Sequence, residues 1–297
     1  MRGRIVVSLL LFATVAVASP RRRSVGAPAD PSLTFAFDSG FRIESATNPM
    51  PGIDAATGET WLYYADNRNN KQMVATSSDG LTFRTPSEAR NSWKNDPRNS
   101  RMPNGTWRRY GWNLQALQFT SSVSSDGATF TQEPGIRYTL QARDNGTMGI
   151  YEAFADTQGG VVLLYIGDMF GLNNVRRAYS RDGGLTFTYD RGNILGDDSA
   201  GGAANSYVDQ KALRLPDGRI RLFTMKQNAI YSFISSDDGY SFQLEPGARL
   251  DRSSFTGATL RTLNDPVVVR LADGRYRMYV ASLRSDNVWV IVSATSR

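Results

Sequence analysis

The sequence predicts an all-β protein, a five-bladed β-propeller whose blades are four-stranded antiparallel sheets. Three observations predict it. A turn motif of the form Ser-x-Asp-x-Gly-x-Thr-Phe, or a copy one residue shorter, recurs four times. A strand, an Asp-Gly or Asn-Gly type of turn and a second, alternating strand recur five times. No segment shows a competing helical period of apolar residues. Repeats of this kind stack as twisted sheets around an axis, which leaves few strand edges exposed.

The elements follow in chain order. The five strand pairs are expected at residues 48–63, 95–110, 151–165, 208–223 and 264–279, and the turn motifs at 77–83, 124–130, 180–187 and 235–242. The last copy ends at Arg297 without its turn motif, and residues 30–35 imitate the missing half. We therefore expect a strand near residues 34–38 to close the fifth blade against a strand near residues 288–293.

Each turn motif has the chemistry of a tight turn. Its Asp accepts hydrogen bonds from turn amides, its Gly adopts a positive φ, and its aromatic residue anchors the turn in the core. The four motif aspartates, Asp79, Asp126, Asp182 and Asp237, are therefore expected to be structural.

The first 32 residues differ in composition from the rest. Residues 1–18 are predicted to be a signal peptide, because Arg2 and Arg4 precede an apolar run that is too short to span a membrane. Residues 19–32 are predicted to be a linker, and residues 33–297 the propeller domain. A retained anchor is the alternative, since Arg21, Arg22 and Arg23 follow the run as stop-transfer charges would. We expect export to the periplasm, cell envelope or medium, and a mature chain without a membrane span.

Composition excludes several functions. The chain has no Cys and no His, so it has no disulfide, no Ser-His-Asp triad and no zinc site of the usual ligands. A general acid or base must be a carboxyl, Lys or Tyr, and any metal must be bound by oxygen. The net charge is +6, but most of the excess lies on the five N-terminal arginines named above. Nucleic acid is therefore not an expected partner.

Two motifs carry a resemblance to known families. The turns at 180–187 and 235–242 resemble the Asp-box, or BNR repeat, of sialidases and related propellers. The segment from Asp265 to Tyr279 looks like the blade sequences of five-bladed glycoside hydrolases of the arabinanase and xylosidase type. The resemblance implies a glycosidase that acts on a carbohydrate, with no organic cofactor, and we expect a monomer. The alternatives are a non-catalytic carbohydrate- or ligand-binding propeller, with Ca²⁺ among the funnel carboxylates as the metal considered, and an interaction scaffold.

The candidate catalytic residues are acids at the starts of the first strands. In propellers of the resembled type these starts converge on an axial funnel, and the acids are Asp96, Glu152, Asp209 and Asp265. Crowded carboxyls raise a pKa, as a general acid at neutral pH requires. For Asp96 and Asp265 the alternative is a structural one, because Asp before Pro often only caps a turn.

By position, the resemblance makes Asp96 the residue that modulates a pKa and Glu152 the acid. The base position falls on Asn48, which cannot take a proton, so Asp54, Asp209 or Asp265 must substitute. We expect Glu152 as proton donor and Asp209 or Asp265 as base or nucleophile. In a sialidase-like site, Tyr207 would pair with Glu152.

Substrate-binding candidates lie in the loops expected on the same face. Lys226 and Arg284 suit an anionic or hydroxyl-rich ligand, and Trp112, Met169 and Phe170 suit stacking on a sugar ring. A sialidase-like arginine clamp would draw on Arg42, Arg143, Arg261 and Arg284.

Overall fold

The computed structural model describes residues 30, 33–89, 92–113, 115–196, 207–257 and 259–297. The chain divides into two units at Asp30 and Pro31. The predicted signal peptide and most of the predicted linker lie outside the described residues, so those two predictions stay predictions. Within the described ranges, no helix is long and apolar enough to cross a membrane.

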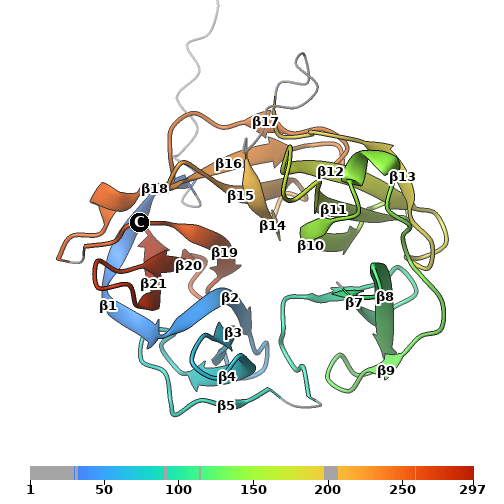
Figure 1. Cartoon of the computed structure of the whole chain (residues 1–297). Coiled ribbons are helices and arrows are strands. Elements are labelled where there is room, and N and C mark those ends of the chain that lie inside the picture. Colours follow the sequence, from blue (N-terminus) through green and yellow to red (C-terminus); the bar gives the residue numbers. More distant parts are fainter. Residues whose placement is uncertain (1–29, 31–32, 90–91, 114, 197–206, 258) are drawn as a thin grey trace, which may run out of the picture. The chain divides into compact units, whose positions relative to one another are not determined.

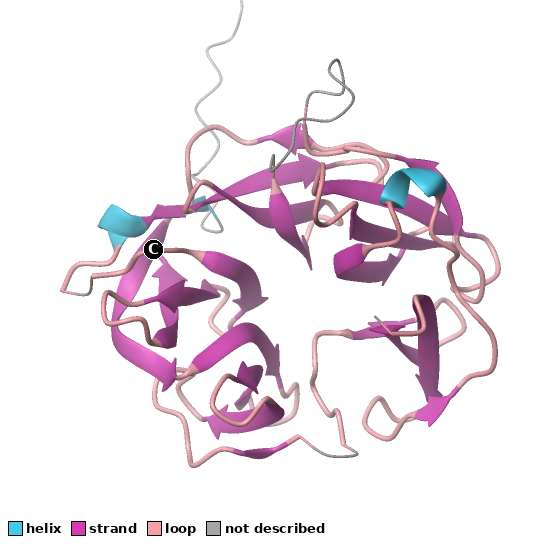
Figure 2. Ribbon diagram, in the orientation of Figure 1, coloured by secondary structure: helices cyan, strands magenta, loops and turns pink. Residues whose placement is uncertain are grey.

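Residues 31–297 form five antiparallel sheets that follow one another around a propeller axis, as the sequence predicts (Figure 1, Figure 2). Blade one contains β2 (Ala46–Ile53), β3 (Thr60–Asp66), β4 (Lys71–Ser77) and β5 (Ser87–Glu88). Blade two contains β6 (Asn99–Arg101), β7 (Trp107–Asn113), β8 (Gln118–Ser124) and β9 (Thr131–Gln132). Blade three contains β10 (Met148–Ala155), β11 (Val161–Gly167), β12 (Asn174–Ser180) and β13 (Thr188–Arg191). Blade four contains β14 (Val208–Arg214), β15 (Ile220–Lys226), β16 (Ala229–Ser235) and β17 (Gln243–Leu244), with β18 (Leu250–Asp251) also paired to β16.

Blade five joins the two ends of the propeller chain. It contains β19 (Asn264–Arg270), β20 (Tyr276–Leu283) and β21 (Trp289–Ser296), and β1 (Phe35–Glu44) is its outer strand. β1 pairs antiparallel with β21, so that Asp38 lies opposite Ser293. The predicted closure is therefore confirmed, and the sheet that would have had a free edge is completed by the start of the domain.

The core lies between adjacent blades rather than at one centre. One cluster joins Phe35 and Val280 of blade five to Phe223 and Ile230 of blade four. Another joins blades two and three, where the ring of Phe119 in β8 packs edge-on against that of Tyr151 in β10 with centroids 5.1 Å apart. Aromatic residues from successive copies of the repeat thus hold neighbouring sheets together.

The turn motifs have the expected hydrogen bonds. The Asp79 carboxylate accepts from the backbone amides of Leu81 and Thr82, each at 2.8 Å, and the Ser77 hydroxyl accepts from the amide of Gly80 at 2.9 Å. The turn amides hold the pKa of Asp79 at about 2. The same acceptor pattern recurs at Asp126, Asp182 and Asp237. These four aspartates are held in turns, and their carboxylates are engaged there.

A second repeat, which sequence analysis did not find, fastens each of three blades to the next. It has the form acid-x-Gly-x-Arg: Asp38 to Arg42, Glu133 to Arg137, and Glu245 to Arg249. The three arginines are buried and donate to the backbone oxygens of Leu81, Leu185 and Leu33, respectively. Leu81 and Leu185 lie in turn motifs, and Leu33 lies in the segment that imitates one. We call these three arginines the latch arginines.

Candidate active site

Irregular first strands place the predicted acids. The pairing of first and second strands shifts register between Val208 and Lys211 in blade four and between Asn264 and Val267 in blade five. Asp209 and Asp265 lie in these bulges with φ values of 55° and 51°. Asn48 has a φ of 51° at the matching place in blade one. Asp and Asn tolerate this left-handed region better than most residues, which explains why they occupy these positions.

Asp209 and Asp265 form a coupled carboxyl pair. The backbone amide of Asp265 donates to the carboxylate of Asp209, and the amide of Asn48 donates to that of Asp265. Burial raises the pKa of Asp209 to about 6. Burial and the charge of Asp209 together raise the pKa of Asp265 to about 7. The pair therefore keeps a proton at a pH where an exposed Asp has lost its own.

Glu152 is paired with Lys211, a residue that sequence analysis missed. The ammonium of Lys211 lies 2.9 Å from Glu152 Oε2 and 3.3 Å from the carbonyl oxygen of Tyr151. Burial raises the pKa of Glu152 although Lys211 opposes the change. The charge of Lys211 also acts on Asp209 and Asp265. Lys211 thus links the two parts of the carboxyl cluster.

The repeat in the sequence could have identified Lys211 as a candidate site residue. Glu152 lies opposite the fourth residue of β11, and Lys211 lies opposite the fourth residue of β15. Met50 and Val267 occupy the same position in blades one and five. A buried Lys and a half-buried Glu at a position that is apolar in blades one and five indicate a purpose other than packing.

Asp96 is held by two arginines. Its side chain is fully buried, with Arg98 Nη2 at 2.6 Å and Arg109 Nη1 at 3.0 Å. Burial opposes ionisation, but the charge and hydrogen bonds of Arg98 and the charge of Arg109 outweigh it and keep the pKa below its usual range. The charge of Asp96 contributes to the raised pKa of Glu152. Asp96 is thus a fixed negative charge beside Glu152.

A cavity of about 330 Å³ lies between the first strands of blades two, three and four. Glu152, Ser100 and Ala212 line it, and so do Arg101 and Arg214 at the ends of β6 and β14. Asp209 and Asp265 are not part of this lining. The structure therefore brings the four predicted acids into one electrostatic cluster, but only Glu152 contacts this cavity.

The predicted binding residues are dispersed. Lys226 lies with its ammonium 4.6 Å from the ring centroid of Tyr207, which packs edge-on against Tyr231 and Phe233. Trp112 packs against the cluster that joins blades two and three. Arg284 forms ion pairs with Glu44 at 2.8 Å and with Asp286 at 2.6 Å.

The remaining candidates are engaged elsewhere. Asp54 follows the end of β2, at the opposite end of that strand from Asn48, and Lys94 lies 2.8 Å from its carboxylate. Phe170 is 80% exposed, and Met169 packs in the cluster between blades three and four. The arginines considered for a sialidase-like clamp make separate contacts: Arg42 as a latch arginine, Arg143 with Tyr189, Arg261 with Asn287 and Arg284 with Glu44. Within the described ranges, no group of three or more Asp or Glu side chains is arranged to bind a metal ion.

No family model matches the chain. No curated protein sequence matches it either. Solved structures do. The catalytic domain of an α-L-arabinofuranosidase of family GH62 from Coprinopsis cinerea superposes with a TM-score of 0.63 at 13% identity, covering 89% of this chain and 97% of that one.

A GH62 hydrolase solved with xylotriose gives a TM-score of 0.60 at 11% identity, covering 89% and 95%. An endo-arabinase from Bacteroides thetaiotaomicron gives 0.56 at 16% identity, covering 88% and 96%. At these identities the likeness shows a shared fold: the chain is a five-bladed β-propeller similar to those of glycoside hydrolases.

Proposed function

We propose that the protein is a glycoside hydrolase that uses the axial carboxyl cluster to cleave a carbohydrate. The observation that carries the proposal is the Asp209–Asp265 pair, whose pKa values are raised to about 6 and about 7, beside the Glu152–Lys211 ion pair. Glycoside hydrolysis needs one carboxyl that holds a proton and a second that is ionised, within one site. The cluster meets that electrostatic requirement near neutral pH.

The roles follow from the surroundings of each residue. Glu152 lines the cavity and has a raised pKa, so it is the proton donor. The Asp209–Asp265 pair carries one negative charge near pH 6 to 7, so it is the base or nucleophile. Lys211 orients Glu152, and the fixed charge of Asp96 helps to keep the proton on it.

The substrate class is supported by two observations. The fold neighbours named above include arabinan- and arabinofuranoside-cleaving enzymes and a hydrolase in complex with xylotriose. Lys226 and Tyr207 form a polar and aromatic pair beside the first residues of β14. We therefore propose a neutral glycan built of pentoses as substrate, reached outside the cell if the N-terminal segment directs export.

A second function is favoured by two features of the site. Asn48 stands where the resemblance requires the catalytic base, and the Asp209–Asp265 pair lies outside the lining of the cavity that Glu152 contacts. A propeller that binds a saccharide without cleaving it would tolerate both features. The experiment that follows distinguishes a protein that cleaves the saccharide from one that only binds it.

The test is hydrolysis of arabino- and xylo-oligosaccharides and of aryl glycosides, sialosides included, between pH 5 and 8, with and without chelator. We expect the wild-type protein to release product from a pentose substrate. Glu152→Gln should lower the rate by about 10²- to 10⁴-fold, which is the usual contribution of a positioned general acid to the rate. Glu88→Gln, in a surface ion pair with Lys71, is the matched control and should leave the rate unchanged.

Two results contradict hydrolysis. An unchanged rate in Glu152→Gln would remove the proton donor from the account. Saturable binding of the same oligosaccharides by the wild-type protein, measured by calorimetry and without product, would establish the binding function instead.

A further inference from the structure

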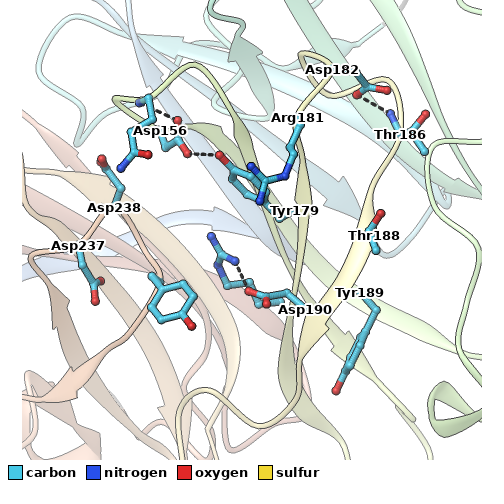
Figure 3. A pocket seen from close by; sticks show the side chains of 13 residues that line it. Asp156, Tyr179, Arg181, Asp182, Thr186, Thr188, Tyr189, Asp190, Asp237 and Asp238 are labelled. Atoms are coloured by element: carbon cyan, nitrogen blue, oxygen red, sulfur yellow. Dashed lines mark hydrogen bonds and ion pairs between the residues drawn. The ribbon is translucent and has the colours of Figure 1, made fainter.

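A large groove lies outside the axial cluster, between the outer strands of blade three and the turn motif of blade four (Figure 3). Its volume is about 810 Å³, within the range of pockets that hold small ligands. β12 and β13 contribute side chains to its lining, and the turns at 180–187 and 235–242 border it. None of the residues assigned to hydrolysis lines this groove.

The sequence explains why the seam between blades three and four, that is, the interface between these two neighbouring sheets, is open at this place. In β7 and β20 the second and fourth residues are Arg and Tyr, and both reach the turn motif of the next blade. Tyr110 donates to Gly184 O at 3.0 Å, and Tyr279 donates to Gly80 O at 2.7 Å. In β11 the same positions hold Val162 and Leu164, which cannot make such bonds. The seam between blades three and four instead uses Arg177 of β12, whose Nε donates to Gly239 O at 3.1 Å.

The turn motifs that border the groove also differ from the others. Those of blades three and four are one residue longer than those of blades one and two. In blade four the added length includes Asp238, which has a φ of 56° and an ion pair with Arg214 at 3.2 Å. The longer turn of blade four and the missing Arg and Tyr of β11 thus coincide with the open space between blades three and four.

The lining defines the kind of ligand. Every side chain in it is Asp, Gln, Arg, Thr or Tyr, and no aliphatic side chain is among them. Aspartates outnumber arginines, so the groove disfavours anions. Its carboxylates are fixed by internal contacts, as when Tyr179 Oη donates to Asp156 at 2.7 Å. Fixed acceptors with free lone pairs suit a neutral ligand that carries many hydroxyl groups.

Aromatic rings in the groove are held rigidly. Tyr240 is 53% exposed and occupies the turn position that Leu81 and Leu185 hold in blades one and three. The guanidinium of Arg191 lies 3.7 Å from the centroid of its ring. Arg177 lies 5.1 Å from the ring of Tyr179 and 5.4 Å from that of Tyr240. A pre-oriented, exposed tyrosine beside fixed carboxylates provides both the stacking and the polar contacts that a sugar uses.

We propose that this groove is a second saccharide-binding site, which holds a neutral oligosaccharide while the axial cluster acts on the chain elsewhere. The ligand class rests on the proposed function; the location and the binding residues rest on the groove itself. Tyr240 supplies the stacking surface, and Gln158 and Thr188 supply neutral donors and acceptors.

The test is calorimetric titration of the xylo- and arabino-oligosaccharides into wild type, Tyr240→Ala and Glu152→Gln. Loss of the Tyr240 ring should weaken binding about three- to tenfold. Gln158→Ala should weaken it as well. Leu81→Ala, the same turn position in blade one, is the matched control and should bind as wild type does. Thermal unfolding should be unchanged in Tyr240→Ala, because the substituted side chain is exposed.

The outcomes separate this inference from the proposed hydrolysis. Binding that depends on Tyr240 in a protein without hydrolytic activity would support the groove and contradict the enzyme. Hydrolysis that depends on Glu152, with Tyr240→Ala binding as tightly as wild type, would contradict the groove alone. No binding of any oligosaccharide by the wild type would overturn the inference. So would binding of oligolysine that is stronger than that of every saccharide and is abolished by salt, because the groove would then take cations.

Discussion

Replacing Asp265 by Asn should stabilise the protein at alkaline pH. Asp265 has a pKa of about 7, against 3.8 for an ordinary Asp, because of burial and the charge of Asp209. At about 1.4 kcal/mol per pH unit, this difference corresponds to about 4 kcal/mol. The native state binds this proton more tightly than the unfolded state does, so the stability that Asp265 contributes is fully present below about pH 4 and is lost as the pH rises to about 7.

The Asn variant avoids that loss. It keeps an oxygen acceptor for the backbone amide of Asn48, and it removes the charge that repels Asp209. At pH 8 its free energy of unfolding should exceed the wild-type value by up to about 4 kcal/mol, whereas at pH 4 the two proteins should be nearly equal. The raised pKa of Asp209, which is due to burial, should leave part of the pH dependence in place.

Urea unfolding followed by tryptophan fluorescence at pH 4, 6 and 8 measures the effect. Asp273→Asn is the control, because Asp273 lies in the exposed turn of the same blade and pairs with Arg275 at 2.8 Å. The pKa of Asp273 is lowered by that partner, so its replacement should give no gain at pH 8. An Asn variant whose free energy of unfolding differs from the wild-type value by the same amount at pH 4 and at pH 8 would refute the reasoning.

Two further predictions concern buried cations. Lys211→Met, which introduces the side chain found at the equivalent Met50, leaves Glu152 without its partner; it should cost about 3–5 kcal/mol at pH 8 and less at pH 4, because the raised pKa of Glu152 favours its neutral form as the pH falls. Urea unfolding at both pH values checks this, and equal losses at both would contradict it. Arg249→Met removes the donors to three carbonyl oxygens, those of Leu33, Pro246 and Gly247; leaving them unsatisfied should cost about 2–4 kcal/mol. The exposed Arg252→Met should change unfolding by no more than about 0.5 kcal/mol, and an equal effect of both variants would show that the latch contributes nothing.

The fold could be predicted because the information is local and repeated. Each blade contains its own turn chemistry and its own strand alternation. The assignment of strands and turns in one copy therefore also predicts those in the next. The closure of blade five could be predicted for the same reason: residues 30–35 continue a pattern that breaks off at Arg297. The latch arginines were missed although they also repeat, because each acid pairs with an arginine far from it in sequence, as Glu133 does with Arg108.

The site could be predicted only in part. The convergence of Asp209 and Asp265 follows from their equivalent places in the repeat. The ionisation state of Asp96 does not, since it depends on Arg98 and Arg109 folding back onto one carboxylate. The partner of Glu152 comes from the neighbouring blade, and no pattern within one blade indicates it. The groove between blades three and four depends on the absence of Arg and Tyr from β11. That absence is informative only when β11 is compared with the second strands of the other blades.

The central claim is that a saccharide binds against a carboxyl cluster that titrates near neutral pH. Carboxyl ¹³C NMR of the wild-type protein between pH 4 and 9, with and without a saturating pentose oligosaccharide, tests it most directly. Two aspartate resonances should titrate near pH 6 and 7 and should shift when the oligosaccharide is added. Aspartates that all titrate below pH 5, or titration curves that the oligosaccharide leaves unchanged, would contradict the account.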